Sequence, residues 1–241
     1  HAINYEYTLN RWHGGDYMKR WHGMMEVSQG MLLHKSTHHF DLVNWWLDSE
    51  PETVFAMGAL RFYGKANAEA RNEEYSYFRT YNVEAAAKDP FRYIGPQDPH
   101  WKDVFDSIYF GSEKEDDYFR DLNVFNDGIS IEDNMGVMVH YKNKAILTYS
   151  LNAHAPWEGY RVTFNGTLQH TNTIFDVTGE GNGPIDSFFN AIQEEKMAHF
   201  TFLDYKSHAI TDGSDSQGVA YILLQDERDG ECYWGVGLSH N

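Results

Sequence analysis

Five side chains that can transfer protons or bind ligands fall within eight consecutive residues, namely His34, Lys35, His38, His39 and Asp41. Apolar residues at helical spacing accompany them and predict one helix from Gly30 to Leu47. At about 100° per residue, His34, His38 and Asp41 project within roughly 60° of one another on such a helix. The sequence therefore predicts a helix with one apolar face and another face that carries chemistry.

Proton transfer is the first chemistry that these residues support. A neutral imidazole can take a proton from a sugar hydroxyl, and a nearby carboxylate orients the ring and raises its pKa. This pattern favours His38 as a general base with Asp41 beside it. Histidines on a helix beside tryptophans are also often buried, hydrogen-bonded and catalytically silent, so a purely structural role stays open.

A metal site is the second chemistry. His34 and His38 are four residues apart, and His22 or Asp41 would have to complete the ligand set. Lys35 stands where the His-Glu-x-x-His signature has its glutamate, so we expect no metal. The role of Lys35 itself stays open between pairing with an acidic side chain and reaching a phosphate or carbonyl oxygen.

The elements that position these residues follow from periodicity and turn signals. Pro51 is expected to stop the helix, and residues 67–121 are expected to form a long, partly helical excursion. The last three predicted strands should form a meander, with Lys142-Asn143 as a tight turn. No Gly-x-Gly-x-x-Gly follows a strand, so the chain shows no dinucleotide-binding crossover of its own. The predicted strands are Ile3–Leu9, Thr53–Tyr63, Met135–Tyr141, Ala145–Leu151 and Tyr160–Phe164.

Composition narrows the class of protein. The 241 residues are 41% hydrophobic and can bury a sizeable core, and a formal net charge of -17 repels nucleic acid and anionic membrane surfaces. No apolar run approaches the roughly 20 residues that span a bilayer. The single cysteine, Cys232, excludes an internal disulfide framework and fits a reducing compartment, so a cytoplasmic location is slightly favoured.

One resemblance rests on four segments, which are Tyr17–Gly23, Gly30–Leu47, Ile131–Asn134 and Ala155–Gly166. These segments are similar to the C-terminal domain of the Gfo/Idh/MocA oxidoreductase family, and the likeness covers about residues 1–168. It implies an α+β fold with a large open mixed or antiparallel sheet, helices on one face and no Rossmann domain.

The resemblance also implies a chemistry. His38 matches the family's general base on the substrate hydroxyl, and Asp41 matches the later acid. Two positions depart from the family motif, because Gln29 replaces a glycine and His34 an aspartate. The family takes NAD(P) on a separate N-terminal domain, binds a sugar or polyol, and often forms homo-oligomers. The expected substrate-binding residues are Arg20, Trp21, His22 and Trp157.

A second resemblance covers about residues 172–241. Residues 179–191, 203–217 and 234–241 resemble the regulatory domain of 2-isopropylmalate synthase, a small α+β module that pairs with a second copy and binds leucine. Asn182, Asp212 and Asp215 are the implied effector-binding residues, although residues 212–215 also suit an ordinary turn. The two resemblances meet near residues 166–173.

These observations predict the substrate-binding and catalytic-base domain of an NAD(P)-dependent sugar or polyol oxidoreductase, followed by a partial leucine-sensing module. Two alternatives stay open. One is a non-catalytic regulatory or oligomerisation module that binds leucine. The other is a cofactor-free lyase or hydrolase that acts on sugars through His34 and His38, with or without a metal.

Overall fold

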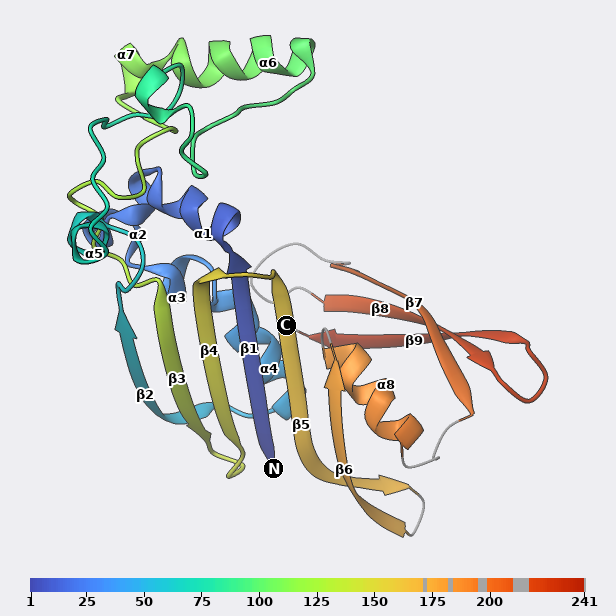
Figure 1. The fold of residues 1–241 in the computed structure, drawn as a ribbon. Coiled ribbons are helices and arrows are strands. Elements are labelled where there is room, and N and C mark those ends of the chain that lie inside the picture. Colours follow the sequence, from blue (N-terminus) through green and yellow to red (C-terminus); the bar gives the residue numbers. More distant parts are fainter. Residues whose placement is uncertain (171–172, 182–183, 195–198, 210–216, 241) are drawn as a thin grey trace.

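Two β-sheets and several short helices make up the computed structural model, which describes residues 1–170, 173–181, 184–194, 199–209 and 217–240 (Figure 1). The larger sheet has the strand order β2-β3-β4-β1-β5-β6, and the smaller has the order β7-β8-β9. The predicted α+β class with a large mixed sheet is confirmed. The strands are β1 Ala2–Asn10, β2 Pro51–Ala59, β3 Asn134–Tyr141, β4 Ile146–Ala155, β5 Gly159–His170, β6 Thr173–Gly181, β7 Phe200–Ala209, β8 Gln217–Asp226 and β9 Cys232–His240.

The first strand lies in the middle of the large sheet. β1 pairs parallel with β4, where Tyr5 faces Tyr149, and antiparallel with β5, where Tyr5 faces Val162. The predicted meander is therefore right for β3 and β4 but wrong for β4 and β5, which do not neighbour each other. Strand spacing along the chain could not reveal this insertion, because β1 precedes its partners by more than 130 residues.

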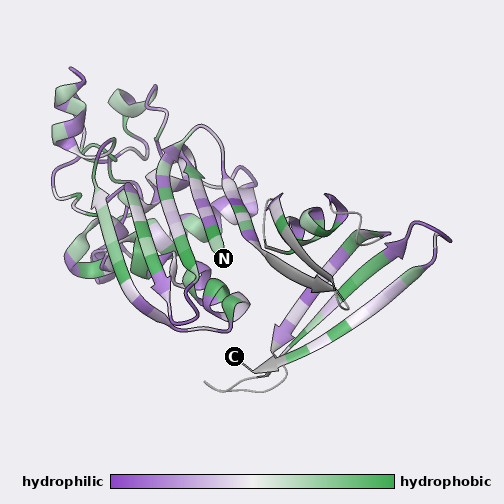
Figure 2. Cartoon of the chain, turned by 90° about the horizontal axis from the view of Figure 1, so that it is seen from below, coloured by the Kyte–Doolittle hydropathy of each residue, from purple (hydrophilic) through white to green (hydrophobic). Residues whose placement is uncertain are grey.

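One face of the large sheet carries the hydrophobic core. Inward residues alternate with outward ones along β1, β3 and β4, and the alternation of apolar and polar residues along the strands is visible in Figure 2. Helix α4 packs on this face and lies behind β4 and β1 in Figure 1. The buried inward residues are Ile3, Tyr5, Tyr7, Leu9, Met135, Val137, Val139, Tyr141, Leu147, Tyr149, Leu151 and Ala153.

The predicted Gly30–Leu47 helix is broken into α3 (Met31–His34) and α4 (Thr37–Leu47). Ser36, at the break, is fully buried, and its hydroxyl accepts a hydrogen bond of 2.8 Å from the Tyr149 hydroxyl. This contact with the sheet fixes the break. His34 and His38 consequently do not share one continuous helical face, which corrects the expectation drawn from helical periodicity.

Short helices connect the strands at one end of the large sheet. After β1 come α1 (Arg11–Met18), a 3₁₀ turn η1 (Trp21–Gly23) and α2 (Met25–Ser28). Residues 67–121 form the predicted, partly helical excursion, which lies beyond the end of the sheet (Figure 1). Its elements are α5 (Lys65–Ala70), η2 (Glu84–Ala86), α6 (Pro99–Phe105), a π-helical turn η3 (Asp106–Phe110) and α7 (Glu113–Asp116).

Helix α8 (Pro184–Glu194) packs against β6 and β5. Gly179 permits this contact, because a Cβ there would lie 1.9 Å from the Ser187 carbonyl oxygen. The Ser187 hydroxyl donates a 2.6 Å hydrogen bond to the Val162 carbonyl. Since Phe164 pairs with Gly179 and also contacts Trp46 of α4, α8 covers the same face as α4.

The point where the two resemblances meet falls inside the β5–β6 hairpin, whose strands pair from Val162–Gly181 to His170–Thr173. The boundary between residues 1–168 and 172–241 stays a prediction. Within the described residues, no helix is long and apolar enough to cross a membrane.

Candidate functional site

Helix α1 brings its side chains close to the end of the sheet. The Asn10 side chain caps the helix by accepting hydrogen bonds from the backbone N–H groups of Trp12 and His13. Gly14 lets the helix lie directly on β4, because a Cβ at that position would sit 1.6 Å from the Ala153 carbonyl oxygen. This close contact places Tyr17 at the centre of the candidate site.

Aromatic rings from α1, η1 and α3 meet around Tyr17. The His22 ring stacks on Trp21 with centroids 3.7 Å apart, and it meets the His34 ring edge-on at 4.4 Å. Tyr17 lies 5.7 Å from His22 and 5.9 Å from His34 between ring centroids. We call the set Tyr7, Tyr17, Trp21, His22, His34, Lys35 and His39 the His–Lys cluster.

His22 is buried in this cluster. Its Nδ1 atom has no hydrogen-bond partner among the described residues. Burial, together with the positive charge of Arg20 and the nearby His34, lowers the pKa of His22 to about 4. His22 is therefore a neutral imidazole at pH 7.

Lys35 lies between two phenols. Its half-buried ammonium group lies close to Tyr7 of β1 and Tyr17 of α1, both of which are buried. Partial burial lowers the pKa of Lys35, but the two tyrosines outweigh it and raise the pKa above its ordinary value. Lys35 therefore carries a positive charge at neutral pH.

His39 lies on the other side of Tyr7. Its Nδ1 atom is 2.9 Å from the Tyr149 hydroxyl, and its ring centroid lies 4.5 Å from that of Tyr7. Burial, followed by the positive charge of Lys35 and the nearby His38, lowers the pKa of His39 to about 4. His39 is thus a neutral residue that is held in place by the core.

His38 and Asp41 lie in the first turns of α4, and both side chains are exposed. His38 directly precedes His39, a member of the His–Lys cluster, and its side chain is exposed, so it lies at the rim of that cluster. No described hydrogen bond or ion pair joins His38 to Asp41. The assignments of His38, His34, Lys35 and Asp41 as catalytic residues stay predictions.

The predicted substrate-binding residues divide into two groups. Trp21 and His22 belong to the His–Lys cluster, and Arg20 borders it with its guanidinium 5.8 Å from the Tyr17 ring while bonding Asp16 at 2.6 Å. Trp157, by contrast, lies beside Arg161 at the start of β5, at 5.9 Å.

Asn182, Asp212 and Asp215, predicted to bind an effector, lie outside the described residues. Their role stays a prediction, and the proposed leucine site receives no structural description.

The sequence analysis gave no role to two members of the cluster, Tyr7 and Tyr17. It also gave none to the neighbouring Tyr149 or to the His13–Glu158 pair, which is joined at 2.9 Å. His39 was noted in the sequence without a role. Alternation along β1 could have predicted that Tyr7 faces the core, but its contact with Lys35 depends on the tertiary structure.

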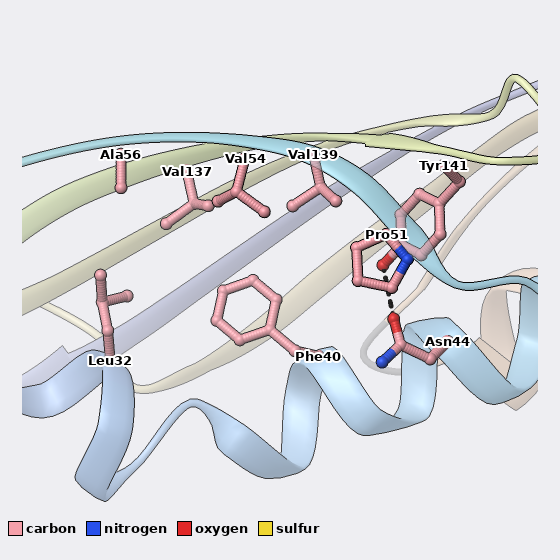
Figure 3. A pocket seen from close by; sticks show the side chains of 9 residues that line it. All are labelled: Leu32, Phe40, Asn44, Pro51, Val54, Ala56, Val137, Val139 and Tyr141. Atoms are coloured by element: carbon pink, nitrogen blue, oxygen red, sulfur yellow. Dashed lines mark hydrogen bonds between the residues drawn. The ribbon is translucent and has the colours of Figure 1, made fainter.

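A separate pocket of about 230 Å³ lies between α3 and α4 on one side and β2 and β3 on the other (Figure 3). Its only hydrogen bond among the lining side chains runs from the Tyr141 hydroxyl to Asn44 Oδ1, at 2.9 Å. Aliphatic and aromatic groups make up the rest of its wall, so it offers no acid–base chemistry. It is lined by Leu32, Phe40, Asn44, Pro51, Val54, Ala56, Val137, Val139 and Tyr141.

A metal or cofactor site requires particular groups of side chains or strands. No group of three or more His, Cys, Asp or Glu side chains there could hold a metal ion, so the ligand set that a metal-assisted lyase requires is not formed. The only parallel pair in the described sheets is β1–β4. A βαβ dinucleotide-binding unit is absent from this part of the chain, and these residues do not fit NAD(P) as a resident cofactor.

Comparison with known families assigns the larger part of the chain. Residues 1–170 match the C-terminal alpha/beta domain of the oxidoreductase family known as Gfo/Idh/MocA. The chain belongs to this oxidoreductase family. Residues 139–241 also match the LeuA allosteric (dimerisation) domain, so the two matches overlap in β4 and β5. Both predicted resemblances are confirmed.

Individual relatives agree with the Gfo/Idh/MocA assignment and with the second match. A protein described as an oxidoreductase, YteT of Bacillus subtilis, is 35% identical over 183 residues, which is 69% of this chain and 40% of YteT. The 2-isopropylmalate synthase of Clostridium acetobutylicum is 45% identical over 65 residues, or 27% of this chain and 11% of the synthase. The chain thus spans less than half the length of these curated relatives.

Among solved structures, the match to a protein described as a dehydrogenase from Thermotoga maritima covers 83% of this chain and 44% of that protein, with 13% identity and a TM-score of 0.33. The match to a protein described as a myo-inositol dehydrogenase from Sinorhizobium meliloti covers 73% of this chain and 38% of that protein, with 12% identity and a TM-score of 0.31. At these scores the two structures add nothing to the Gfo/Idh/MocA assignment.

Proposed function

We propose that this chain supplies the substrate-binding and proton-transfer side of an NAD(P)-dependent oxidoreductase that acts on a CH–OH group of a sugar or polyol. The observation that carries the proposal is the place of His38 at the exposed rim of the His–Lys cluster. A substrate hydroxyl above the cluster could reach His38 without any buried side chain having to move.

The chemistry assigned to this chain is limited to its own residues. His38 accepts the hydroxyl proton, and Asp41, one turn later on α4, returns it to solvent. Trp21 offers a flat apolar surface to a sugar ring. His39 and Tyr149 hold the first turn of α4 against the sheet and so fix the direction in which His38 points. A hydride acceptor would have to come from outside the described residues.

The test measures sugar binding and turnover separately. Calorimetric titration with neutral sugars and polyols reports binding, and an NAD(P)-binding domain from the Gfo/Idh/MocA family, supplied in trans, reports turnover. His38→Ala should lower turnover about 10²- to 10⁴-fold, the usual contribution of a general base, while binding changes little. His100→Ala, an exposed histidine on α6, is the matched control.

Two results would contradict this function. An unchanged rate in His38→Ala would remove the general-base assignment. Absence of binding by every neutral sugar, polyol and sugar acid tested would remove the substrate site altogether.

A regulatory function is the second candidate, because residues 139–241 match an allosteric dimerisation domain. In this case the chain binds leucine and pairs with a second copy, with or without oxidoreductase chemistry. Calorimetric titration with L-leucine tests it, with D-leucine as the stereochemical control. Equal heats for both enantiomers would argue against a leucine site.

A further inference from the structure

Lys35 is a charged group in the His–Lys cluster that lacks an acidic partner. Among the described residues, no carboxylate lies within 4.0 Å of its ammonium group. The two acidic groups near the cluster already have partners, because Asp16 binds Arg20 at 2.6 Å and Glu158 lies 2.9 Å from His13. The positive charge of Lys35 is therefore not compensated by a neighbouring carboxylate, although the net charge of the protein is -17.

The ammonium group of Lys35 has more donors than its two tyrosine neighbours can use. It has three N–H donors, and Tyr7 and Tyr17 offer it at most one phenol oxygen each. Neutral phenols do not compensate a positive charge that is partly removed from water. The third donor and the uncompensated charge together suit an anionic oxygen, which forms shorter and stronger hydrogen bonds with a cation than a neutral oxygen does.

The groups around Lys35 are neutral but polar. At pH 7 the buried His22 and the half-buried His39 carry no charge, since removal from water lowers the pKa of each to about 4. The exposed His34, whose ring meets that of His22 edge-on at 4.4 Å, can hydrogen-bond to a ligand hydroxyl. Trp21 adds an aromatic face. One cation beside hydroxyl-binding groups and an aromatic ring suits a sugar that carries a carboxylate.

We propose that Lys35 binds the carboxylate of an acidic sugar, a uronate or an aldonate, and thereby sets the substrate class of this site. The inference rests on the proposed function, since it assumes that a sugar lies over the His–Lys cluster. It adds a role for Lys35 that neither family match assigns.

The test compares two sugars that share one ring. D-glucuronate and D-glucose differ only at C6, where one has a carboxylate and the other a hydroxymethyl group. Calorimetry at pH 7.5 and low ionic strength should show glucuronate binding about tenfold tighter than glucose, as expected for one charge-assisted hydrogen bond. Salt should reduce this preference.

Three variants connect the preference to Lys35. In Lys35→Gln the two sugars should bind equally, whereas Lys35→Arg should keep a preference for glucuronate. Lys88→Gln removes the same charge from an exposed lysine elsewhere and should keep the preference of the unchanged chain. Circular dichroism of each variant verifies that the fold persists, and the Lys35→Arg result decides the question if Lys35→Gln unfolds.

Each other outcome overturns the inference in a recognisable way. Equal affinity for the two sugars in the unchanged chain would refute the acidic-sugar assignment alone and leave the proposed function in place. Binding of neither sugar would overturn the acidic-sugar assignment, and if every other sugar and polyol also failed to bind, the proposed function would be removed as well. Acetate that binds as tightly as glucuronate would show that Lys35 holds any small anion rather than an acidic sugar.

Discussion

At the scale of single residues, the buried His22 and the half-buried His39 make the folded state sensitive to acid. The pKa values of His22 and His39 are about 4 in the folded protein, whereas an unfolded histidine titrates near its ordinary value of 6.5. Between these values the unfolded chain binds more protons than the folded chain. Stability from each histidine is fully present above pH 6.5 and is lost as the pH falls towards 4.

We therefore expect His39→Gln to weaken the pH dependence of unfolding. The change removes one titrating group, so the slope of unfolding free energy between pH 6.5 and 4.5 should fall by at most about 1.4 kcal/mol per pH unit. Solvent screening of the partly exposed ring reduces this figure. Urea denaturation at several pH values measures this slope. The difference in unfolding free energy between His39→Gln and the unchanged protein at pH 8 gives the effect of packing alone. An identical slope in the two proteins would contradict the prediction.

At the scale of elements, α8 depends on a glycine in the neighbouring strand. Gly179→Ala would place a Cβ 1.9 Å from the backbone oxygen of Ser187, so α8 or β6 must shift. We expect destabilisation of about 1–3 kcal/mol, the usual cost of overpacking, with faster hydrogen exchange in α8.

Gly237→Ala is the matched control for this change. Nothing lies within 4 Å of a Cβ at that position in β9, and alanine restricts the unfolded chain, so this variant should be neutral or slightly more stable. Equal exchange rates in α8 for both variants would show that Gly179 does not determine its packing.

Sequence periodicity predicted most elements but not their contacts. Alternating apolar residues indicated β1, β3 and β4 correctly, because that pattern depends on each strand alone. The Gly30–Leu47 helix was predicted without its break, because the break depends on the hydrogen bond between Ser36 and Tyr149, which are 113 residues apart. Hydrophobic spacing contains no information about such a partner.

At the scale of the whole molecule, the small sheet exposes an apolar face. Trp234, Val236 and Leu238 alternate along the edge strand β9, and their exposed fractions are 54%, 62% and 68%. Exposed apolar residues grouped on one face often mark an interface. Since residues 139–241 match a dimerisation domain, we expect this face to contact a second copy of the chain.

Val236→Lys should shift the protein towards the monomer by at least about tenfold in dissociation constant, because it places a charge in an apolar contact. Sedimentation velocity over a range of concentrations measures the change. Val27→Lys, which alters an equally exposed valine on α2 (55% exposed), is the control. A monomeric unchanged chain, or equal shifts in both variants, would contradict the assignment of this face.

The sequence by itself determined the chemistry that is available and the class of the fold. The residues between His34 and Asp41, the alternation along the strands and the two family motifs are all local patterns, and each could be recognised without knowing its surroundings. The tertiary structure decided which groups meet. It inserted β1 between β4 and β5, and this insertion brought Tyr7 beside Lys35 and His39. Charge compensation and pKa depend on neighbours distant in sequence, so only the folded chain could show that Lys35 keeps its charge while His39 loses its own.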